Sequence, residues 1–400
     1  QVRLLLPSGC VRPGVVAARA GAMGEDNAVY MKWSSRLHDE RNKGKKALTL
    51  RRLKEAAKVH QSRELDFKLF GANAPALGLS REYYRMGRRP VSPGLQERAS
   101  KLGLRLEHLA VTIGTVIHNV DLQEPQTDEM IDFIRSALLE RKVIFFRGQH
   151  ISVDQQIAFA HRFGPLDPFP FSDHVEGNPK VLRIAGIGNA PANVWHSDVT
   201  WMEKPSLGSI LHMIEVPEVG GDTAFSDSHA AYLGLPEGVK KEIENVHAIH
   251  DYREFLARDR DRGVSEDTIN ELKAEVPFGV AHPLVRTHPE TGKQALYLHG
   301  GFMRHASLHT GEGPWEQERA RLMTRFLLQQ HAKLEYQCRF KWESGSIAFW
   351  DNRACQHSAT GDYFPNVRVG HRVTISGTRP YYDPNAVPVT VPIDTPAAKL

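Results

Sequence analysis

The stretch Ile347–His357, IAFWDNRACQH, opens with an apolar run that predicts a buried strand and ends on a histidine just past it. The earlier stretch Trp195–Asp198, WHSD, adds a second histidine and a carboxylate. In His-x-Asp the two side chains are two apart on an extended chain, so both project from the same side. The sequence therefore predicts that a strand-rich scaffold brings His196, Asp198 and His357 to one metal ion.

Two cationic residues follow the second histidine on another predicted strand. Arg368 comes eleven residues after His357, and Arg372 four residues further on. Side chains alternate along a strand, so both guanidinium groups should share one face. Two histidines and one carboxylate on one face of a metal are typical of non-haem Fe(II) oxygenases, which leave the opposite face open. An iron site that faces two fixed cations indicates anionic partners.

The short apolar segments predict a chain that is mainly β-sheet with covering helices. Leu334–Trp342 alternates cleanly, with Leu334 and Tyr336 on the inward face. Many short strands with a few helices favour a double-stranded β-helix, or jelly-roll, core. The insert from Ala230 to Leu296 is a candidate lid. The other strands are predicted at Val143–Phe146, Val181–Ile184, Ser209–Ile214, Thr223–Ser226, Ala295–Leu298, Ser346–Trp350 and Arg368–Ser376, and the helices at Asp128–Arg141, Asp154–Phe163, Gly238–Asn245 and Trp315–His331.

Charge is distributed unevenly along the chain. Residues 1–100 carry 20 Lys and Arg against 9 Asp and Glu, whereas the remaining residues carry 31 against 38. We predict a basic extension over residues 1–104, a catalytic domain over 105–382 and a tail over 383–400. The start, residues 1–24, bears arginine but no acid, which is typical of a mitochondrial or plastid transit peptide. The alternative for that segment is an untranslated or vector-derived extension.

Composition excludes several classes of protein. The three cysteines are few and unpatterned, which argues against a secreted disulfide scaffold and against a structural zinc knuckle. No run of about 18 apolar residues appears, so we expect no transmembrane helix and no membrane partner. The basic run at residues 41–46 is more often a solvated helix face than a nucleic-acid contact, so no nucleic acid is expected. We expect a protein that is not secreted and is cytoplasmic, or mitochondrial or plastid if residues 1–24 are a transit peptide.

A family resemblance covers the chain from about Leu106 to Tyr382. The order of motifs, His-x-Asp, then Thr223, then a distal His and an Arg eleven residues later, resembles the taurine dioxygenase family of Fe(II)/2-oxoglutarate enzymes. Thr223 lies in Gly220–Thr223, and 24 residues separate it from Asp198. The sequence around these motifs also matches the family pattern, at Trp195–Thr200, Val285–Pro289, Trp350–Arg353 and Gly370–Arg372.

The resemblance implies a role for each motif residue. His196, Asp198 and His357 would hold Fe(II), and Arg368 with the Thr223 hydroxyl would bind the distal carboxylate of 2-oxoglutarate. Arg suits this task because its planar fork fits a carboxylate and stays charged in a dry pocket. The resemblance implies hydroxylation with O2 of a small organic anion, a sulfonate in the namesake enzymes, and a taurine-like alkyl sulfonate would then release sulfite and leave an aldehyde. A carboxylate at Asp198 leaves no site for a halide, which favours hydroxylation over halogenation. The resemblance also implies a homo-oligomer, dimer or tetramer.

Substrate recognition is where the sequence departs from the namesake enzymes. The resemblance implies that Arg372 binds the anionic group of the substrate. In the namesake enzymes a histidine also helps to bind this group, and Phe169 occupies its position here. An asparagine that meets the taurine amine falls at Ala192. An alkyl sulfonate other than taurine is therefore the first prediction, with a sulfate ester or an aryloxyacetate as the alternative. Val199 and Phe302, and with less support Tyr252, are the remaining predicted pocket residues.

Further predictions concern neighbours of the metal site and rival functions. Gln356 and Asn352 are candidates for orienting His357, and Cys355 is expected to pack rather than react. One rival is a zinc hydrolase that uses the same triad with a metal-bound water. The other is a binding protein in which the basic first 100 residues engage nucleic acid or a membrane and the core is a vestige. The paired arginines and Thr223 fit the hydrolase poorly, and all five motif residues are present, which disfavours the vestige.

Overall fold

A computed structural model describes residues 91–169, 174–187, 192–261, 263–276 and 278–388. The predicted targeting segment, residues 1–24, and the basic run at 41–46 lie outside the described residues. So does the end of the predicted tail, residues 389–400.

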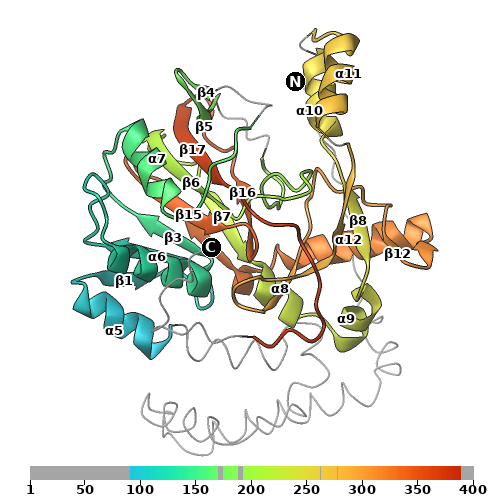
Figure 1. Cartoon of the computed structure of the whole chain (residues 1–400), viewed down its shortest axis with the longest axis horizontal. Coiled ribbons are helices and arrows are strands. Elements are labelled where there is room, and N and C mark those ends of the chain that lie inside the picture. Colours follow the sequence, from blue (N-terminus) through green and yellow to red (C-terminus); the bar gives the residue numbers. More distant parts are fainter. Residues whose placement is uncertain (1–90, 170–173, 188–191, 262, 277, 389–400) are drawn as a thin grey trace, which may run out of the picture. The chain divides into compact units, whose positions relative to one another are not determined.

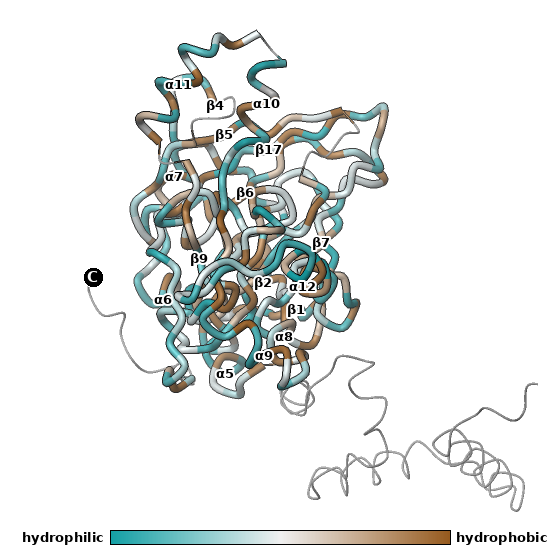
Figure 2. Tube along the Cα trace, turned by 90° about the vertical axis from the view of Figure 1, so that its right-hand side faces the viewer, coloured by the Kyte–Doolittle hydropathy of each residue, from teal (hydrophilic) through white to brown (hydrophobic). Residues whose placement is uncertain are grey.

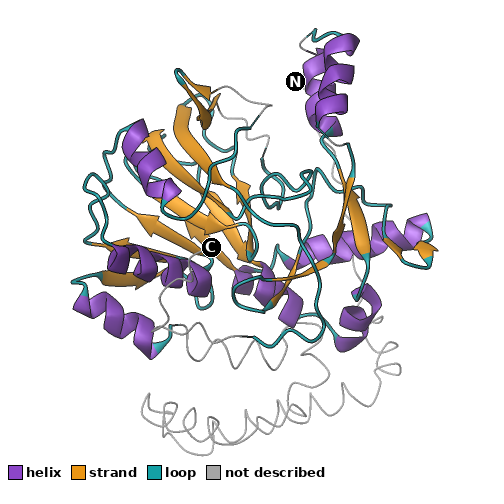
Figure 3. Cartoon of the chain, in the orientation of Figure 1, coloured by secondary structure: helices purple, strands orange, loops and turns teal. Residues whose placement is uncertain are grey.

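The described chain is built on a major and a minor β-sheet (Figures 1 and 3). The major sheet has eight strands, antiparallel except for the parallel pair β2 and β3, and the minor sheet has three antiparallel strands. In spatial order the major sheet consists of β1 (Arg105–His108), β2 (Thr115–His118), β3 (Val143–Phe146), β15 (Ile347–Asp351), β6 (Gly208–Glu215), β17 (Val367–Ile375), β5 (Asn178–Ile187) and β4 (His174–Val175). The minor sheet consists of β14 (Gln337–Phe340), β7 (Thr223–Asp227) and β16 (Cys355–Ala359).

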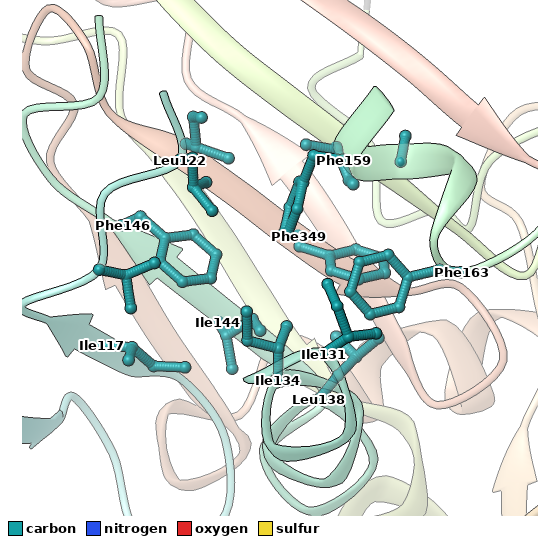
Figure 4. Close-up of a cluster of buried hydrophobic side chains, with 14 of the residues drawn as sticks. Ile117, Leu122, Ile131, Ile134, Leu138, Ile144, Phe146, Phe159, Phe163 and Phe349 are labelled. Atoms are coloured by element: carbon teal, nitrogen blue, oxygen red, sulfur yellow. The ribbon is translucent and has the colours of Figure 1, made fainter. Parts of the chain in front are cut away.

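One face of the major sheet is covered by helices α6 (Asp128–Arg141) and α7 (Val153–His161). Helix α6 begins where the Thr127 side chain accepts the Met130 amide, and it ends at Lys142, whose φ of 61° stops the helix. Figure 4 shows the apolar cluster between helices and sheet, in which Phe163 packs edge-to-face on Phe349 with ring centroids 4.9 Å apart. This cluster holds the helices in place and fixes which face of each central strand points away from them.

The opposite face of the major sheet packs on the minor sheet. Strand β15 illustrates the alternation, since Phe349 joins the helix-side cluster whereas Ala348 and Trp350 join the cluster shared with the minor sheet. On β17, Val373 and Ile375 lie in the helix-side cluster. The alternate residues of β17 therefore face the minor sheet, as the strand parity predicted.

The predicted insert, Ala230 to Leu296, forms a second, smaller assembly of helices and short strands together with the following residues up to Gln330. Two small sheets, β10–β11 and β13-β12-β8-β9, pack with helices around a separate apolar cluster. The elements are α8 (Ser228–Leu233), α9 (Glu237–Ile243), β8 (His247–His250), α10 (Arg253–Asp261), α11 (Glu266–Glu275), β9 (Val280–Pro283), β10 (Val285–Thr287), β11 (Gln294–Leu296), β12 (His309–Thr310), β13 (Gly313–Pro314) and α12 (Gln317–Gln330).

The structure corrects the strand predicted at Leu334–Trp342. Its first three residues, Leu334–Tyr336, form a 3-10 turn, and only Gln337–Phe340 pairs as β14. Leu334 is 80% exposed rather than inward, because the turn follows directly on α12 and does not continue the strand's alternation. The inward side of the strand proper, Cys338 and Phe340, is buried as predicted.

Helix α5 (Pro93–Lys101) was not predicted, and it packs on α6. Its N-terminus is capped by the Ser92 side chain, and Leu95 and Ala99 are buried in the helix-side cluster. The packed core therefore begins before Arg105. Only these two positions of the helix are buried, which is too few to give a clear apolar period in the sequence.

Hydropathy changes sign repeatedly along the described trace (Figure 2). Among the described residues, no helix is both long and apolar enough to cross a membrane.

Candidate metal centre

The two histidines of the predicted triad are joined through their backbones. His357 lies on β16, and His196 lies on the segment between β5 and β6. The His357 amide donates to the His196 carbonyl at 2.8 Å, and the His196 amide donates back to the His357 carbonyl at 3.1 Å. This bridge brings together two residues 161 positions apart and leaves their rings with centroids 4.0 Å apart.

Asp198 completes a buried cluster with these histidines. Its Oδ1 lies 4.0 Å from His196 Nε2 and 3.9 Å from His357 Nε2, and all three side chains are buried. These gaps are too long for hydrogen bonds, and all three donor atoms lie within 4.8 Å of one another, close enough to reach one metal ion. His196 Nδ1 is 2.7 Å from the Val194 carbonyl, so it carries the proton and leaves Nε2 free to bind a metal. The donor set therefore fits a metal ion.

The charges at the cluster are those that a metal requires. Burial lowers the pKa of His357 well below its usual range, with His196 adding to the shift, and burial likewise lowers the pKa of His196. Burial alone would raise the pKa of Asp198, but Arg372 and the two histidines outweigh it and hold this pKa below its ordinary value. Neutral imidazoles and an ionised carboxylate are the metal-binding forms.

Asp198 is braced from the side away from the histidines. Ser209 Oγ donates to Asp198 Oδ2 at 2.7 Å, and the Asp198 amide donates to Asn352 Oδ1 at 3.0 Å. The prediction that Asn352 orients His357 is therefore wrong, because Asn352 orients Asp198.

The other two neighbours of His357 in sequence lie elsewhere. Gln356 does not hydrogen-bond to the His357 ring, since its Nε2 donates to the Leu298 carbonyl at 2.7 Å and His357 Nδ1 has no partner among the described residues. Cys355 is buried and its Sγ lies 3.7 Å from the Lys142 carbonyl, in keeping with packing.

A strained turn follows the ligand segment. Val199 has φ of +49°, a left-handed conformation that a β-branched residue rarely adopts. Such strain costs roughly 1–3 kcal/mol and is found where surrounding structure enforces it. The turn ends the extended segment directly after Asp198, and the Val199 side chain lines the cavity described below.

Both predicted arginines point from β17 toward the cluster. Arg372 Nη1 donates to Asp198 Oδ1 at 2.8 Å, and its guanidinium lies 5.8 Å from the centre of the Phe169 ring. Arg368 Nη2 donates to the Thr223 hydroxyl at 3.3 Å. Trp342 Nε1 donates to the same hydroxyl at 2.9 Å, and the Arg368 guanidinium lies 5.6 Å from the centre of a Trp342 ring. The two cations thus occupy different positions, one at Asp198 and one at Thr223.

A cavity of about 360 Å³ opens beside the cluster. Phe169, Val199 and Phe302 lie in its wall, as does Ala192, the position that a taurine-binding asparagine would occupy. Tyr252 does not line it, because its ring is buried against Trp201 and its hydroxyl donates to the Val276 carbonyl at 2.6 Å. The remaining wall residues are Leu182, Ile184, Val194, His196, Asp198, Glu254, Phe255, His299, Gly301 and Arg372.

Several residues of the cavity wall were not predicted from the sequence. Glu254 and Phe255 come from α10, so the insert contributes part of the cavity wall. His299 comes three residues after the end of β11 and three residues before Phe302, and this proximity to a predicted pocket residue was the one signal in the sequence that could have indicated it.

The buried His-Asp-His cluster fits a 2-oxoglutarate-dependent dioxygenase, and comparison with known proteins shows that the chain belongs to that class. The profile of the taurine catabolism dioxygenase TauD, TfdA family matches residues 105–374, and the chain belongs to this family.

Three relatives show how close the similarity is. An alkylsulfatase of Acinetobacter baylyi is 33% identical over 68% of this chain and 85% of its own length. An alpha-ketoglutarate-dependent sulfate ester dioxygenase of Pseudomonas putida is 34% identical over 70% of this chain and 91% of its own. The crystal structure of a taurine dioxygenase from Burkholderia xenovorans has a TM-score of 0.59 and 31% identity, covering 71% of this chain and 94% of that one.

Proposed function

We propose that this dioxygenase hydroxylates an organic anion with an apolar tail, an alkyl sulfate ester or an alkyl sulfonate, at the carbon next to the anionic group. The observation that carries the proposal is the cavity, in which Arg372 lies beside Asp198 and most of the wall is apolar. We also propose that the major and minor sheets are the two sheets of a jelly roll. The catalytic domain would span residues 105–382, with α5 packed on it.

His196, Asp198 and His357 would hold Fe(II). Support comes from their spacing, their burial and the neutral imidazoles that face one ionised carboxylate. When bound together, Fe(II), 2-oxoglutarate and O2 supply the oxidation that puts one oxygen atom on the substrate carbon and the other into succinate, with loss of CO2. The three side chains would hold the metal from one side and leave its other side open to the cavity.

Arg368 and Thr223 would bind the distal carboxylate of 2-oxoglutarate. Arg368 already shares the Thr223 hydroxyl with Trp342, which orients the guanidinium before any ligand arrives. A guanidinium held in this way loses little side-chain freedom when it forms a bidentate pair with a carboxylate.

Arg372 would bind the anionic group of the primary substrate, with Phe169, Val199 and Phe302 around the tail. Ala192 offers no hydrogen-bond donor or acceptor in its side chain, so the partner that an asparagine at this position gives the taurine amine is missing, and Glu254 is the one acidic wall residue outside the metal cluster among those described. A tail of carbon atoms suits the apolar wall better. This favours a sulfate ester or a longer sulfonate over taurine.

The outcome of hydroxylation follows from the substrate. Replacing C–H by C–OH next to a sulfate ester oxygen gives an adduct that expels sulfate and leaves an aldehyde. The same change next to a sulfonate sulfur expels sulfite and leaves an aldehyde. An aryloxyacetate remains the alternative, because a carboxylate also pairs with a guanidinium.

The test is succinate formation by anaerobically purified, Fe(II)-loaded protein after oxygen is admitted. Hexyl sulfate, hexane sulfonate, taurine, an aryloxyacetate and the neutral 1-hexanol would be compared, with His196→Ala as the inactive control. We expect a hexyl anion to stimulate turnover more than taurine or 1-hexanol. Stronger stimulation by 1-hexanol than by the hexyl anions would contradict the proposal that the substrate is an anion. Product release that persisted without oxygen would favour the zinc hydrolase.

A further inference from the structure

His299 is a buried polar residue of the cavity wall that the proposed roles leave unused. It is 3% exposed, follows β11, and its ring stacks on Phe302 with centroids 4.0 Å apart. The ring centroid lies 5.3 Å from that of His196. His299 is thus beside the metal cluster but has a place of its own in the wall.

The backbone fixes which ring nitrogen of His299 carries the proton. The amides of Gly301 and Phe302 donate to His299 Nδ1 at 2.9 and 2.8 Å. An amide can only donate, so Nδ1 must be the unprotonated nitrogen and Nε2 must carry the hydrogen. The loop after β11 therefore holds the ring as a neutral donor with one orientation.

The donor at Nε2 has no protein partner among the described residues. The atom is buried, and no hydrogen-bond acceptor reaches it. A buried donor without a partner costs free energy comparable to a lost hydrogen bond, so such a group calls for a ligand or an ordered water. Because Nε2 is protonated, it has no lone pair in the ring plane with which to bind the metal.

We propose that His299 Nε2–H donates a hydrogen bond to an oxygen of the substrate's anionic group, in concert with Arg372. The inference rests on the proposed function. An oxoanion has more acceptor oxygens than the one guanidinium of Arg372, which also donates to Asp198, is placed to contact, so a second donor in the wall would add to its binding. Since Phe169 supplies no polar atom to the cavity, His299 and Arg372 are the side-chain donors of the described wall outside the metal cluster.

Two substitutions distinguish the role of His299 Nε2 from that of Nδ1. His299→Asn keeps an acceptor near the Nδ1 position, so it can still receive the loop amides, but it has no atom at the Nε2 position. His299→Gln reaches the Nε2 position with an amide donor and loses the acceptor for the loop. A donor role predicts that Gln retains more affinity for the substrate than Asn, whereas a role in holding the loop predicts the reverse.

The experiment is calorimetric titration of hexyl sulfate into anaerobic protein loaded with Fe(II) and 2-oxoglutarate, with 1-hexanol as the neutral comparison. We expect His299→Asn to raise the Kd of hexyl sulfate about tenfold, and His299→Gln to raise it by about threefold or less. The Kd of the neutral alcohol should change by less than about twofold, since it lacks the anionic acceptor.

Other results would overturn the inference. These are an unchanged Kd for hexyl sulfate in His299→Asn, an equal loss for the neutral alcohol, or a weakened affinity for 2-oxoglutarate alone, which would place the donor on the co-substrate. Wild-type protein that consumes 2-oxoglutarate but binds none of the anions would instead overturn the proposed anionic substrate, a separate and recognisable failure.

Discussion

Arg372 donates from Nη1 to Oδ1 of Asp198 at 2.8 Å, so the cation proposed to bind the substrate also contacts a carboxylate proposed to bind the metal. Asp198 is buried and Arg372 is mostly buried, and Arg372 is the largest influence that lowers the pKa of Asp198. With these proposed roles, substrate binding and the charge of the metal site would be linked through one side chain.

Replacing Arg372 should weaken substrate binding strongly. Hydrogen bonds to charged groups contribute about 1.5–3 kcal/mol each, so Arg372→Met should raise the KM of the anionic substrate roughly ten- to a hundredfold. Arg379→Met is the matched control, because Arg379 is 67% exposed and its contact with Glu203 is long, at 3.5 Å. Succinate-coupled kinetics for both variants would check this, and equal KM values in Arg372→Met and wild type would contradict it.

The second arginine should act on the co-substrate, 2-oxoglutarate, instead. We expect Arg368→Met to raise the KM of the co-substrate roughly ten- to a hundredfold, because a bidentate charged contact is lost. Thr223→Val removes only the shared hydroxyl and should raise the same constant about threefold to tenfold. The KM of the primary substrate separates the two arginines. A larger effect of Arg368→Met on the primary substrate than on the co-substrate would mean that their roles are exchanged.

Phe169 should set the preference between substrates. Phe169→His places a polar ring 5.8 Å from the position of the Arg372 guanidinium and removes apolar wall. We expect kcat/KM for taurine to rise relative to hexyl sulfate by roughly tenfold, the effect of about one hydrogen bond to a charged group. Phe169→Leu is the control, since it keeps the wall apolar. A similar shift in both variants would mean that size rather than polarity decides.

Strand β17 shows most clearly which features could be predicted from the sequence. Arg368 and Arg372 could be predicted to share a face because alternation is a local property of any strand, and the two clusters on either side of β15 and β17 follow the same rule. The grouping of His196, Asp198 and His357 could be predicted as well, because their residue types and order suggest one metal site. That the insert acts as a lid stays a prediction, although its residues Glu254 and Phe255 line the cavity wall.

The remaining features depend on contacts between distant segments. The state of His299 is decided by where two loop amides point, which no periodicity encodes. Asn352 was predicted to orient His357 because the two are near in sequence, but it binds Asp198, which is 154 positions away. Leu334 alternates in phase with β14, yet the end of α12 and a 3-10 turn take it out of the sheet. In each case tertiary packing overrides a local pattern.

The ion pair between Asp351 and Arg353 should stabilise the fold behind the site. Arg353 Nη2 lies 2.7 Å from Asp351 Oδ2, Asp351 is fully buried, and His288 Nε2 lies 3.0 Å from the same oxygen. Removing one partner of a buried pair leaves an uncompensated charge, at a cost of about 3–5 kcal/mol. Arg353→Met should lower the free energy of unfolding at pH 7 by about that amount, measured by urea denaturation. Lys101→Ala, which breaks an exposed pair with Glu97, should change it by less than about 1 kcal/mol.

The pH dependence of that difference provides a sharper check. Burial alone would raise the pKa of Asp351, but Arg353 and His288 outweigh it and hold this pKa well below its ordinary value of 3.8. A carboxyl whose pKa is lower in the folded state stabilises the fold fully above about pH 4, and this contribution is lost as the pH falls toward the folded value. In the variant, burial without that cation raises the pKa of Asp351, so the gap between wild type and Arg353→Met should be widest at pH 7, should narrow as the pH falls, and should still be narrowing below about pH 4. A gap that stayed constant to pH 3 would mean that the loss comes from the packing of the Arg353 side chain rather than from its charge.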